Sequence, residues 1–259
     1  MVIREGDYVL LVDDSGNEWL VKVRRDYEFT THHGKLNLGD LIGLEYGCIC
    51  KTHTGRRLYV LKPTLEEYIL HSKRPTQIVY PKDIGYILLK SGLRSDSIVL
   101  EVGTGSGAIT TTLCWFIREG IIDSYERRRD IAEVALLNLK RLNCLDRVRL
   151  HIMDFKDAEV DRDYYDLAIV DVDTPWEVIN KVYYAIKPSA SIFIILPTYN
   201  QLDKLLSYIK SNKNIKLVKI SAEEVFIREL QAEAGRIRPY FRMIGYTAVL
   251  FTARKVRKE

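Results

Sequence analysis

Three glycines at every second position, Gly103, Gly105 and Gly107, follow an apolar segment that ends in Glu101. A helix-like segment comes next, and then a second apolar segment that ends in Glu126. The order strand, glycine turn, helix, strand and acid is typical of nucleotide-handling α/β units. In such units the turn lets a ligand approach the backbone, and the second acid binds a ribose. The alternative is a tight strand-to-helix turn that binds no ligand.

The spacing of the glycines and the charge beside them indicate which nucleotide would bind. A dinucleotide fold needs the pattern G-x-G-x-x-G, which places a pyrophosphate at a helix N-terminus. This chain has G-x-G-x-G preceded by Glu101. A carboxylate beside the turn would repel a pyrophosphate, but it suits a ligand with an ammonium or sulfonium group. S-adenosylmethionine has both groups and no phosphate, and Glu126 could accept hydrogen bonds from both of its ribose hydroxyls.

A third acid, Asp154, follows the strand-like segment 148–153. Ligands of open α/β sheets bind outside the carboxyl ends of the strands, so this acid is expected near the same ligand. Its side chain could accept a hydrogen bond from an adenine amino group. The alternative is that Asp154 only caps a short helix that begins at Phe155.

A fourth acid, Asp171, closes the apolar segment 166–170 and is followed by Pro175 and Trp176. An acid and a tryptophan just past a central strand suggest a substrate pocket, in which the ring stacks on a base and the acid binds an amino group. The alternative is that both side chains only cap the next helix.

The elements that must position these acids alternate between strands and helices. The helix expected at 128–142 has an apolar face that contains Ile131, Ala135, Leu139 and Leu142. Seven strands alternating with helices predict an α/β fold with a doubly wound, Rossmann-like sheet whose last pair is antiparallel. The expected strands cover residues 97–102, 121–125, 147–152, 165–172, 190–196, 216–220 and 246–253.

The first part of the chain has a different pattern and predicts a small all-β domain. Turn signals separate its short alternating segments. Thr64 and Glu67 then form a capping-box pattern that predicts a helix start. We therefore expect a β-domain over residues 1–64 and a second domain, with the Rossmann-like sheet, over 65–259. The expected strands are Tyr8–Val12, Glu18–Arg24, Leu41–Leu44, Cys48–Lys51 and Arg57–Leu61.

Composition excludes several classes of protein. The chain has 259 residues, of which 47% are hydrophobic, and no segment reaches the ~18 uncharged apolar residues of a membrane span. Its first residues lack a signal-peptide pattern, so we expect a cytoplasmic protein. Four cysteines do not make a disulfide framework at this length, and the pair Cys48 and Cys50 is read as a strand with both thiols on one face.

Positive charge is concentrated near the C-terminal end. The net charge is +4, and residues 228–259 contain eight Lys or Arg residues against three Glu residues. A basic edge of this kind suits a phosphate-rich partner. The alternative is an ordinary solvated surface with a basic tail.

With these motifs in view, the chain resembles the tRNA adenine-N1-methyltransferases that modify the T-loop, in their bacterial and archaeal homotetrameric form. The most specific match is the segment 74–83, RPTQIVYPKD, and the resemblance extends over most of the chain. The other matching segments are 61–70, 101–110, 125–126, 171–176, 236–239, 243–247 and 253–255.

The resemblance implies a class I S-adenosylmethionine methyltransferase fold, a homotetramer, tRNA as partner and substrate, and neither a metal nor a membrane. Methylation at N1 makes an adenine cationic, so Asp171 is the expected catalytic residue, stabilising that charge. Expected substrate contacts are Gln77, Tyr80, Trp176 and Arg238. The expected cofactor-binding residues are Gln77, Glu101, Gly103, Thr104, Gly105, Ser106, Gly107, Glu126, Asp154 and Asp171.

Two positions depart from the family pattern. Asp173 stands where the family usually has proline, and Tyr246 stands where it usually has histidine. Two alternative functions stay open. One is a protein isoaspartate carboxyl methyltransferase, which shares the cofactor loop. The other is a non-catalytic RNA-binding subunit, which would not bind the cofactor.

Overall fold

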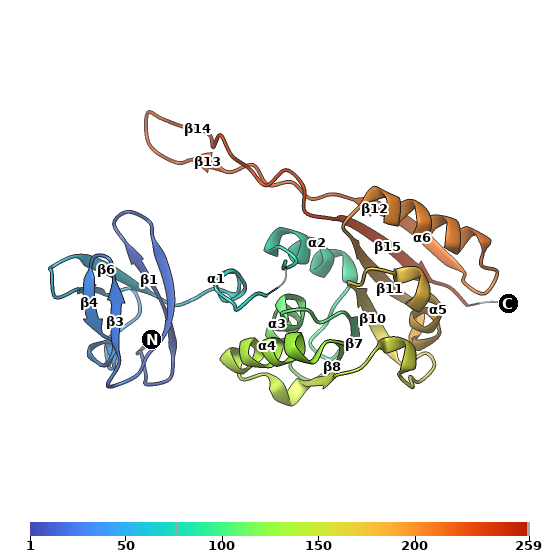
Figure 1. The fold of residues 1–259 in the computed structure, drawn as a ribbon, viewed down its shortest axis with the longest axis horizontal. Coiled ribbons are helices and arrows are strands. Elements are labelled where there is room, and N and C mark those ends of the chain that lie inside the picture. Colours follow the sequence, from blue (N-terminus) through green and yellow to red (C-terminus); the bar gives the residue numbers. More distant parts are fainter. Residues whose placement is uncertain (76, 258–259) are drawn as a thin grey trace. The chain divides into compact units, whose positions relative to one another are not determined.

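The computed structural model describes residues 1–75 and 77–257, which form two compact units, Met1–Ser72 and Lys73–Glu259 (Figure 1). Helix α1 (Leu65–Leu70) belongs to the first unit. It begins with the expected capping box, in which Thr64 and Glu67 each accept a backbone N–H from the other. The domain boundary expected after residue 64 stays a prediction.

The N-terminal unit is built on an antiparallel sheet of four strands in the order β2-β1-β6-β5. Its core contains Val9, Leu11, Leu38, Leu41 and Leu58, all fully buried. Cys48 and Cys50 both pack against this core, as the expected strand with both thiols on one face requires. The strands are β1 (Tyr8–Asp13), β2 (Glu18–Lys22), β5 (Ile49–Lys51) and β6 (Arg57–Leu61).

The strand expected at Leu41–Leu44 is wrong. Residues Leu38–Leu41 form a short 3₁₀ helix, capped by the Asn37 side chain, which accepts a hydrogen bond from the Gly39 N–H. Leu38 and Leu41 are three positions apart and both buried, which suits a helical turn and not the alternation of a strand. A hairpin of β3 (Glu28–Thr31) and β4 (Gly34–Asn37) is also present, although no expected strand covers it.

The C-terminal unit contains the expected seven-stranded sheet, in the order β12-β15-β11-β10-β7-β8-β9. Five neighbouring strands are parallel, and β15 runs antiparallel to both β11 and β12. The α/β class and the antiparallel final strand are therefore confirmed. The strands are β7 (Ile98–Val102), β8 (Ile121–Tyr125), β9 (Val148–His151), β10 (Tyr165–Val170), β11 (Ile186–Leu196), β12 (Leu217–Glu223) and β15 (Val249–Lys255).

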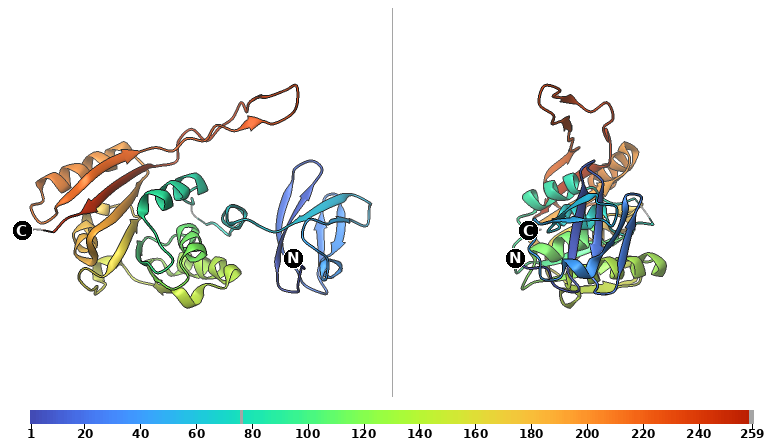
Figure 2. Two further views of the ribbon diagram at one scale, coloured as in Figure 1. Left: turned by 180° about the vertical axis from the view of Figure 1, so that it is seen from behind. Right: turned by 90° about the vertical axis from the view of Figure 1, so that its left-hand side faces the viewer.

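Helices cover both faces of this sheet, with α2, α3 and α4 on one face and α5 and α6 on the other (Figures 1 and 2). Because both faces are covered, central strands such as Ile98–Val102 and Tyr165–Val170 are almost continuously apolar and buried. The helices are α2 (Pro81–Ser91), α3 (Ala108–Phe116), α4 (Arg129–Leu139), α5 (Pro175–Ala185) and α6 (Tyr199–Ser211), with short 3₁₀ helices at Lys140–Leu142, Leu145–Arg147 and Phe155–Asp157.

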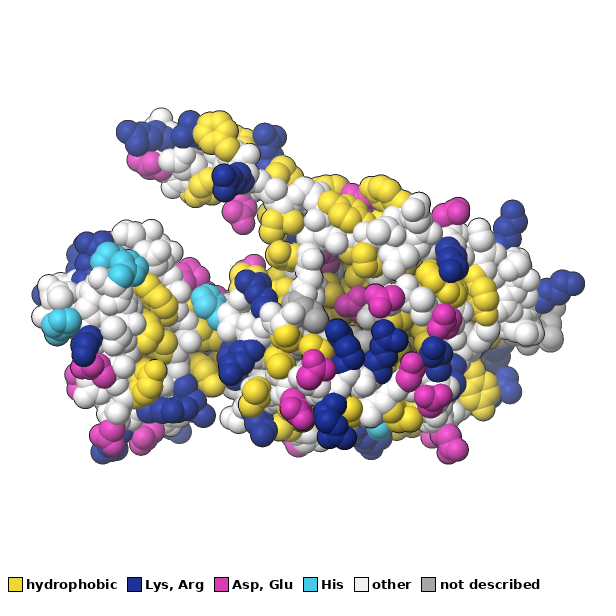
Figure 3. All heavy atoms as spheres, viewed as in Figure 1, with side chains coloured by type: hydrophobic (Ala, Val, Ile, Leu, Met, Phe, Trp, Pro, Cys, Tyr) yellow, Lys and Arg dark blue, Asp and Glu magenta, His cyan; other side chains and the backbone are white. Residues whose placement is uncertain are grey.

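Between β12 and β15 the chain leaves the sheet as a long hairpin, residues 224–248, which we call the arm (Figures 1 and 2). Near its tip β13 (Leu230–Gln231) pairs with β14 (Arg238–Pro239). Basic, acidic and hydrophobic side chains are interspersed over its surface (Figure 3). The exposed hydrophobic residues of the arm are Phe226, Ile227, Leu230, Ile237, Tyr240, Phe241, Met243, Ile244 and Tyr246.

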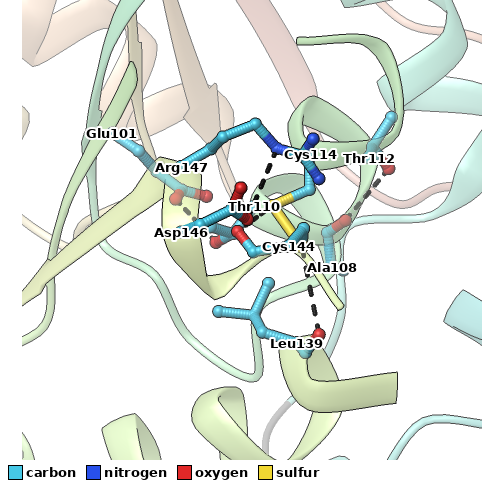
Figure 4. The surroundings of a disulfide bond; sticks show 9 residues. All are labelled: Glu101, Ala108, Thr110, Thr112, Cys114, Leu139, Cys144, Asp146 and Arg147. Carbon is cyan, nitrogen blue, oxygen red and sulfur yellow. Dashed lines mark hydrogen bonds and ion pairs between the residues drawn. A yellow bond between two sulfur atoms is a disulfide. The ribbon is translucent and has the colours of Figure 1, made fainter. Parts of the chain in front are cut away.

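A disulfide joins Cys114 of α3 to Cys144, which follows α4 (Figure 4). The cysteine count did not predict this bond, because the two residues are separated by 30 positions and only the packing of α3 brings them together. The described residues contain no helix that is both long enough and apolar enough to cross a membrane.

Candidate active site

The glycine turn connects the end of β7 to the start of α3. Gly103, Gly105 and Gly107 all have positive φ angles, of 97°, 54° and 85°, a region that residues with a Cβ atom rarely adopt. A Cβ atom on Gly103 would also lie 2.0 Å from the carbonyl oxygen of Asp171, so this glycine lets the turns after β7 and β10 touch. A Cβ atom on Gly105 would meet no atom within 4 Å, which leaves this position open to a ligand.

Glu101 lies in β7, below the turn, and is almost completely buried. One carboxylate oxygen, Oε2, accepts hydrogen bonds from the hydroxyls of Thr110 (2.6 Å, Figure 4) and Ser124 (2.5 Å). Ser124 lies 2.6 Å from the hydroxyl of Thr104 in the turn. The other oxygen, Oε1, is buried without a partner among the described residues. Burial raises the pKa of Glu101 to about 7, against the lowering effect of its hydrogen bonds from Ser124 and Thr110.

Glu126 follows β8 and binds the glycine turn directly. Its Oε2 accepts the backbone N–H of Gly105 and its Oε1 that of Arg128, both at 3.0 Å. Each oxygen retains a second lone pair for a further donor. The turn and the second-strand acid, which the sequence placed in one unit by motif alone, are therefore in direct contact.

A pocket of about 230 Å³ opens at the carboxyl ends of the strands. It is lined by Gly103, Glu126, Asp154 and Asp171, and we call it the cofactor pocket. Asp154 also caps the 3₁₀ turn Phe155–Asp157, because its Oδ1 accepts the Lys156 N–H at 2.9 Å. The two roles considered for this acid are thus compatible.

A second, smaller pocket lies on the other side of Asp171. Gln77, Tyr80, Asp83 and Thr247 line it together with Asp171, and we call it the substrate pocket. Asp171 alone among the described residues lines both pockets. Burial raises the pKa of Asp171 to about 7, and the nearby carboxylates of Asp173 and Glu126 act in the same direction.

The family model described as the tRNA methyltransferase complex GCD14 subunit matches residues 56–240, and the model described as TrmI-like N-terminal matches residues 2–50. This chain belongs to that methyltransferase family. The resemblance inferred from its motifs is confirmed.

Two similar curated relatives carry specific names. The tRNA (adenine(58)-N(1))-methyltransferase TrmI of Thermus thermophilus is 32% identical over 248 residues, which is 95% of this chain and 96% of the relative. The tRNA (adenine(57)-N(1)/adenine(58)-N(1))-methyltransferase TrmI of Methanocaldococcus jannaschii is 29% identical over 273 residues, covering 95% of this chain and 94% of the relative.

Two solved structures share the fold over the whole chain. The tRNA (m1A58) methyltransferase TrmI of Aquifex aeolicus is 34% identical, has a TM-score of 0.87 and covers 100% of both chains. A SAM-dependent O-methyltransferase of Thermotoga maritima is 30% identical, has a TM-score of 0.92 and covers 100% of this chain and 96% of its own. The expected methyltransferase fold class is therefore confirmed.

Within this family fold, two of the expected substrate residues lie apart from both pockets. Trp176, on α5, lines neither pocket, and the Lys204 ammonium lies 3.9 Å from the centre of its ring. Arg238, on the arm, donates to the side-chain oxygen of Gln231 at 3.1 Å and stacks on Phe241. The local sequence around Trp176 and Arg238 did not indicate that Lys204 and Gln231 would be their partners.

The two departures from the family pattern have structural partners of their own. Asp173 lies at the cofactor pocket, 3.7 Å from the guanidinium of Arg127, which lines the same pocket. The Tyr246 hydroxyl donates to the Pro197 carbonyl at 2.8 Å, and its ring meets Tyr199 edge-on. Both residues therefore contact other residues of the loops around the site, although the exposed Asp173–Arg127 pair contributes little to stability.

Sequence reasoning missed several polar groups that support the site. Ser124 in β8 donates to Glu101, and its only signal was a polar residue beside Asp123 in a short, buried strand. Lys181 of α5 donates to the carbonyls of Phe155 (3.2 Å), Lys156 and Ala158 (2.9 Å), and so holds the turn that follows Asp154. Nothing in the local sequence around Lys181 points to these carbonyls.

Proposed function

We propose that this protein transfers a methyl group from S-adenosylmethionine to N1 of a T-loop adenine in tRNA, at position 58, position 57 or both. The observation that carries the proposal is the position of Asp171, between a pocket with the family's cofactor turn and a second pocket lined by Gln77 and Tyr80. The names of the Thermus, Methanocaldococcus and Aquifex relatives support the same reaction.

The residues of the cofactor pocket fit S-adenosylmethionine. The cofactor, when bound, supplies a methyl group on a sulfonium. The open space at Gly105 admits a ligand to the backbone, and the free lone pairs of Glu126 suit two ribose hydroxyls. Glu101, whose Oε1 has no partner among the described residues, would add negative charge below the turn when it is ionised. The residues that we propose to hold the cofactor are Gln77, Glu101, Gly103, Thr104, Gly105, Ser106, Gly107, Glu126, Asp154 and Asp171.

Asp171 is the proposed catalytic residue. In its ionised form it would accept a hydrogen bond from the adenine amino group, and this acceptor would select adenine over guanine, whose corresponding edge carries an oxygen. The same charge would stabilise the positive charge that develops on the base. Gln77 and Tyr80 would hold the base in line for transfer.

We propose that the arm and neighbouring copies of the chain hold the tRNA. Arg238 and the other basic residues of the arm suit phosphate contacts, which would offset the few kcal/mol needed to flip out a base. Trp176 lines neither pocket, so it would contact the base only outside the two pockets. The homotetramer and the cytoplasmic location stay predictions. The protein isoaspartate alternative has no support among the relatives described above.

The experiment that tests the proposal follows labelled methyl transfer to unmodified tRNA transcripts in which adenine 57 or adenine 58 is replaced. We expect label in the parent transcript and its loss when the target adenine is replaced. Label in an isoaspartyl peptide and in no tRNA would contradict the proposal. Failure to bind S-adenosylmethionine at all would favour the non-catalytic subunit.

A further inference from the structure

A buried ion pair at the first turn of α2 has no role in the proposed chemistry. The ammonium of Lys82 lies 2.9 Å from Oδ1 of Asp83, and the side chains are 10% and 0% exposed. Burying two charges costs free energy unless their hydrogen bonds are satisfied. We therefore expect both groups of this pair to make further hydrogen bonds with the residues around them.

The pair binds both ends of the arm. Lys82 donates to the carbonyl oxygen of Val225 and to the hydroxyl oxygen of Thr247, each at 2.7 Å. Thr247 in turn donates its hydroxyl to Oδ2 of Asp83 at 2.8 Å. The three N–H donors of the ammonium thus have three acceptors, Asp83, Val225 and Thr247, and the hydroxyl both accepts and donates.

The same network forms part of the substrate pocket. Asp83 and Thr247 line this pocket together with Asp171 and Tyr80. Tyr80 is the cap residue of α2, and its carbonyl accepts the backbone N–H of Asp83 at 3.0 Å. A shift of Asp83 would therefore move both the wall that carries Tyr80 and the segment through Thr247.

We propose that Lys82 is a positioning residue, which with Asp83 and Thr247 couples the base of the arm to the substrate pocket. This inference rests on the proposed function, because the pocket it positions is the one assigned to the adenine. The network makes one rigid unit of the pocket wall and the two strands of the arm. The arm can then orient a bound tRNA relative to Asp171 only while this unit is intact.

The primary variant is Lys82→Met, which keeps an unbranched side chain of similar length and removes all three donors. Lys82→Met alone leaves the buried Asp83 carboxylate without its partner, which can unfold the protein. A second variant, Lys82→Met/Asp83→Asn, therefore removes both charges. Lys82→Arg is the conservative variant. The matched control is Lys90→Met, which removes an α2 lysine that binds Glu223 of β12 at 2.7 Å but lines neither pocket.

The measurements are kcat and KM for tRNA methylation and the Kd of S-adenosylmethionine. In both Lys82→Met and the double variant we expect kcat to fall at least tenfold, with a cofactor Kd within threefold of the wild type. Lys82→Arg should recover part of the loss, and Lys90→Met should keep kcat within twofold.

Three results would overturn the inference. A folded double variant with wild-type kcat would show that the pocket does not depend on the network. An equal loss in Lys90→Met would reduce the effect to general docking of α2 on β12. A wild type that binds the cofactor but methylates no tRNA would overturn the proposed function itself, and this inference with it.

Discussion

Asp171 should make the proposed reaction sensitive to pH near neutrality. Its pKa is raised to about 7, first by burial and then by Asp173 and Glu126, whereas the proposed role needs the ionised form. We therefore expect kcat/KM to rise with pH below 7 and to level off above it, since this parameter reports groups of the free enzyme. Measuring kcat/KM between pH 5.5 and 8.5 tests this, as ~3 pH units span the transition.

Glu101 complicates that profile, because burial also raises its pKa to about 7. The variant Glu101→Gln separates the two groups. If the inflection near pH 7 persists in this variant, Asp171 is the titrating residue. If it disappears, the pH dependence belongs to Glu101 and not to Asp171. In Asp171→Asn itself, kcat should fall roughly 10²- to 10³-fold while the cofactor still binds.

The same raised pKa values affect stability with the opposite sign. A carboxyl whose folded pKa lies above its unfolded value binds more protons in the folded state, so the folded state loses stability as pH rises between the two values. Glu101 and Asp171 therefore oppose folding increasingly from about pH 4 to about pH 7. The ionised groups that the proposed activity needs are held at the expense of stability.

Glu126 gives a second prediction at the residue scale. The substitution Glu126→Ala leaves the N–H groups of Gly105 and Arg128 without an acceptor and removes the proposed ribose acceptor. We expect the Kd of S-adenosylmethionine to rise more than about tenfold, the effect of losing a charged buried acceptor. Isothermal titration of the cofactor checks this. An unchanged Kd would remove Glu126 from the cofactor site.

At the scale of elements, α5 should control the cofactor pocket through Lys181. This ammonium holds the carbonyls of Phe155 and Ala158, and so the turn that carries Asp154 into the pocket. We expect Lys181→Met to raise the KM for S-adenosylmethionine about 5- to 10-fold, the effect of about 1–1.5 kcal/mol. The kcat at saturating cofactor should change much less, because Lys181 lines neither the cofactor pocket nor the substrate pocket.

The control for this prediction is Lys187→Met. Lys187 forms an ion pair with Asp166 at 2.6 Å, and both side chains are considerably exposed. Such a pair contributes little, so the KM for the cofactor should stay near the wild-type value. Equal changes in the two variants would mean that the Lys181 effect does not act through the turn.

Local pattern was sufficient to predict the elements that carry the site. The glycine turn, the acid in β7 and the acids after β8 and β10 were predictable because neighbouring residues determine where a strand ends and a turn begins. Contacts between distant segments were not. Lys82 reaches Val225 across 143 positions, and Lys181 reaches Phe155 across 26, so only the assembled fold reveals either network. The 3₁₀ helix at Leu38–Leu41 was missed because four residues are too few to distinguish its period from that of a strand.

At the scale of the whole molecule, each unit has a core of its own, and the C-terminal unit has an additional covalent link. The disulfide between Cys114 and Cys144 lies one helical turn after Thr110, whose hydroxyl binds Glu101 (Figure 4). It therefore fixes α3, the helix that begins directly after the cofactor turn, to the segment that follows α4. Closing a loop of this length removes entropy from the unfolded chain.

Reduction of this bond should lower the melting temperature of the C-terminal unit. The loop closed by Cys114 and Cys144 predicts a stabilisation of about 3–4 kcal/mol, equivalent to roughly 7–15 °C for a unit of this size. Thermal unfolding with and without reductant measures the shift. The variant Cys114→Ala/Cys144→Ala should show no further change with reductant, whereas Cys48→Ser/Cys50→Ser should respond like the wild type, because those thiols are free. A wild type whose melting temperature is the same with and without reductant would show that the bond contributes nothing to the fold in solution.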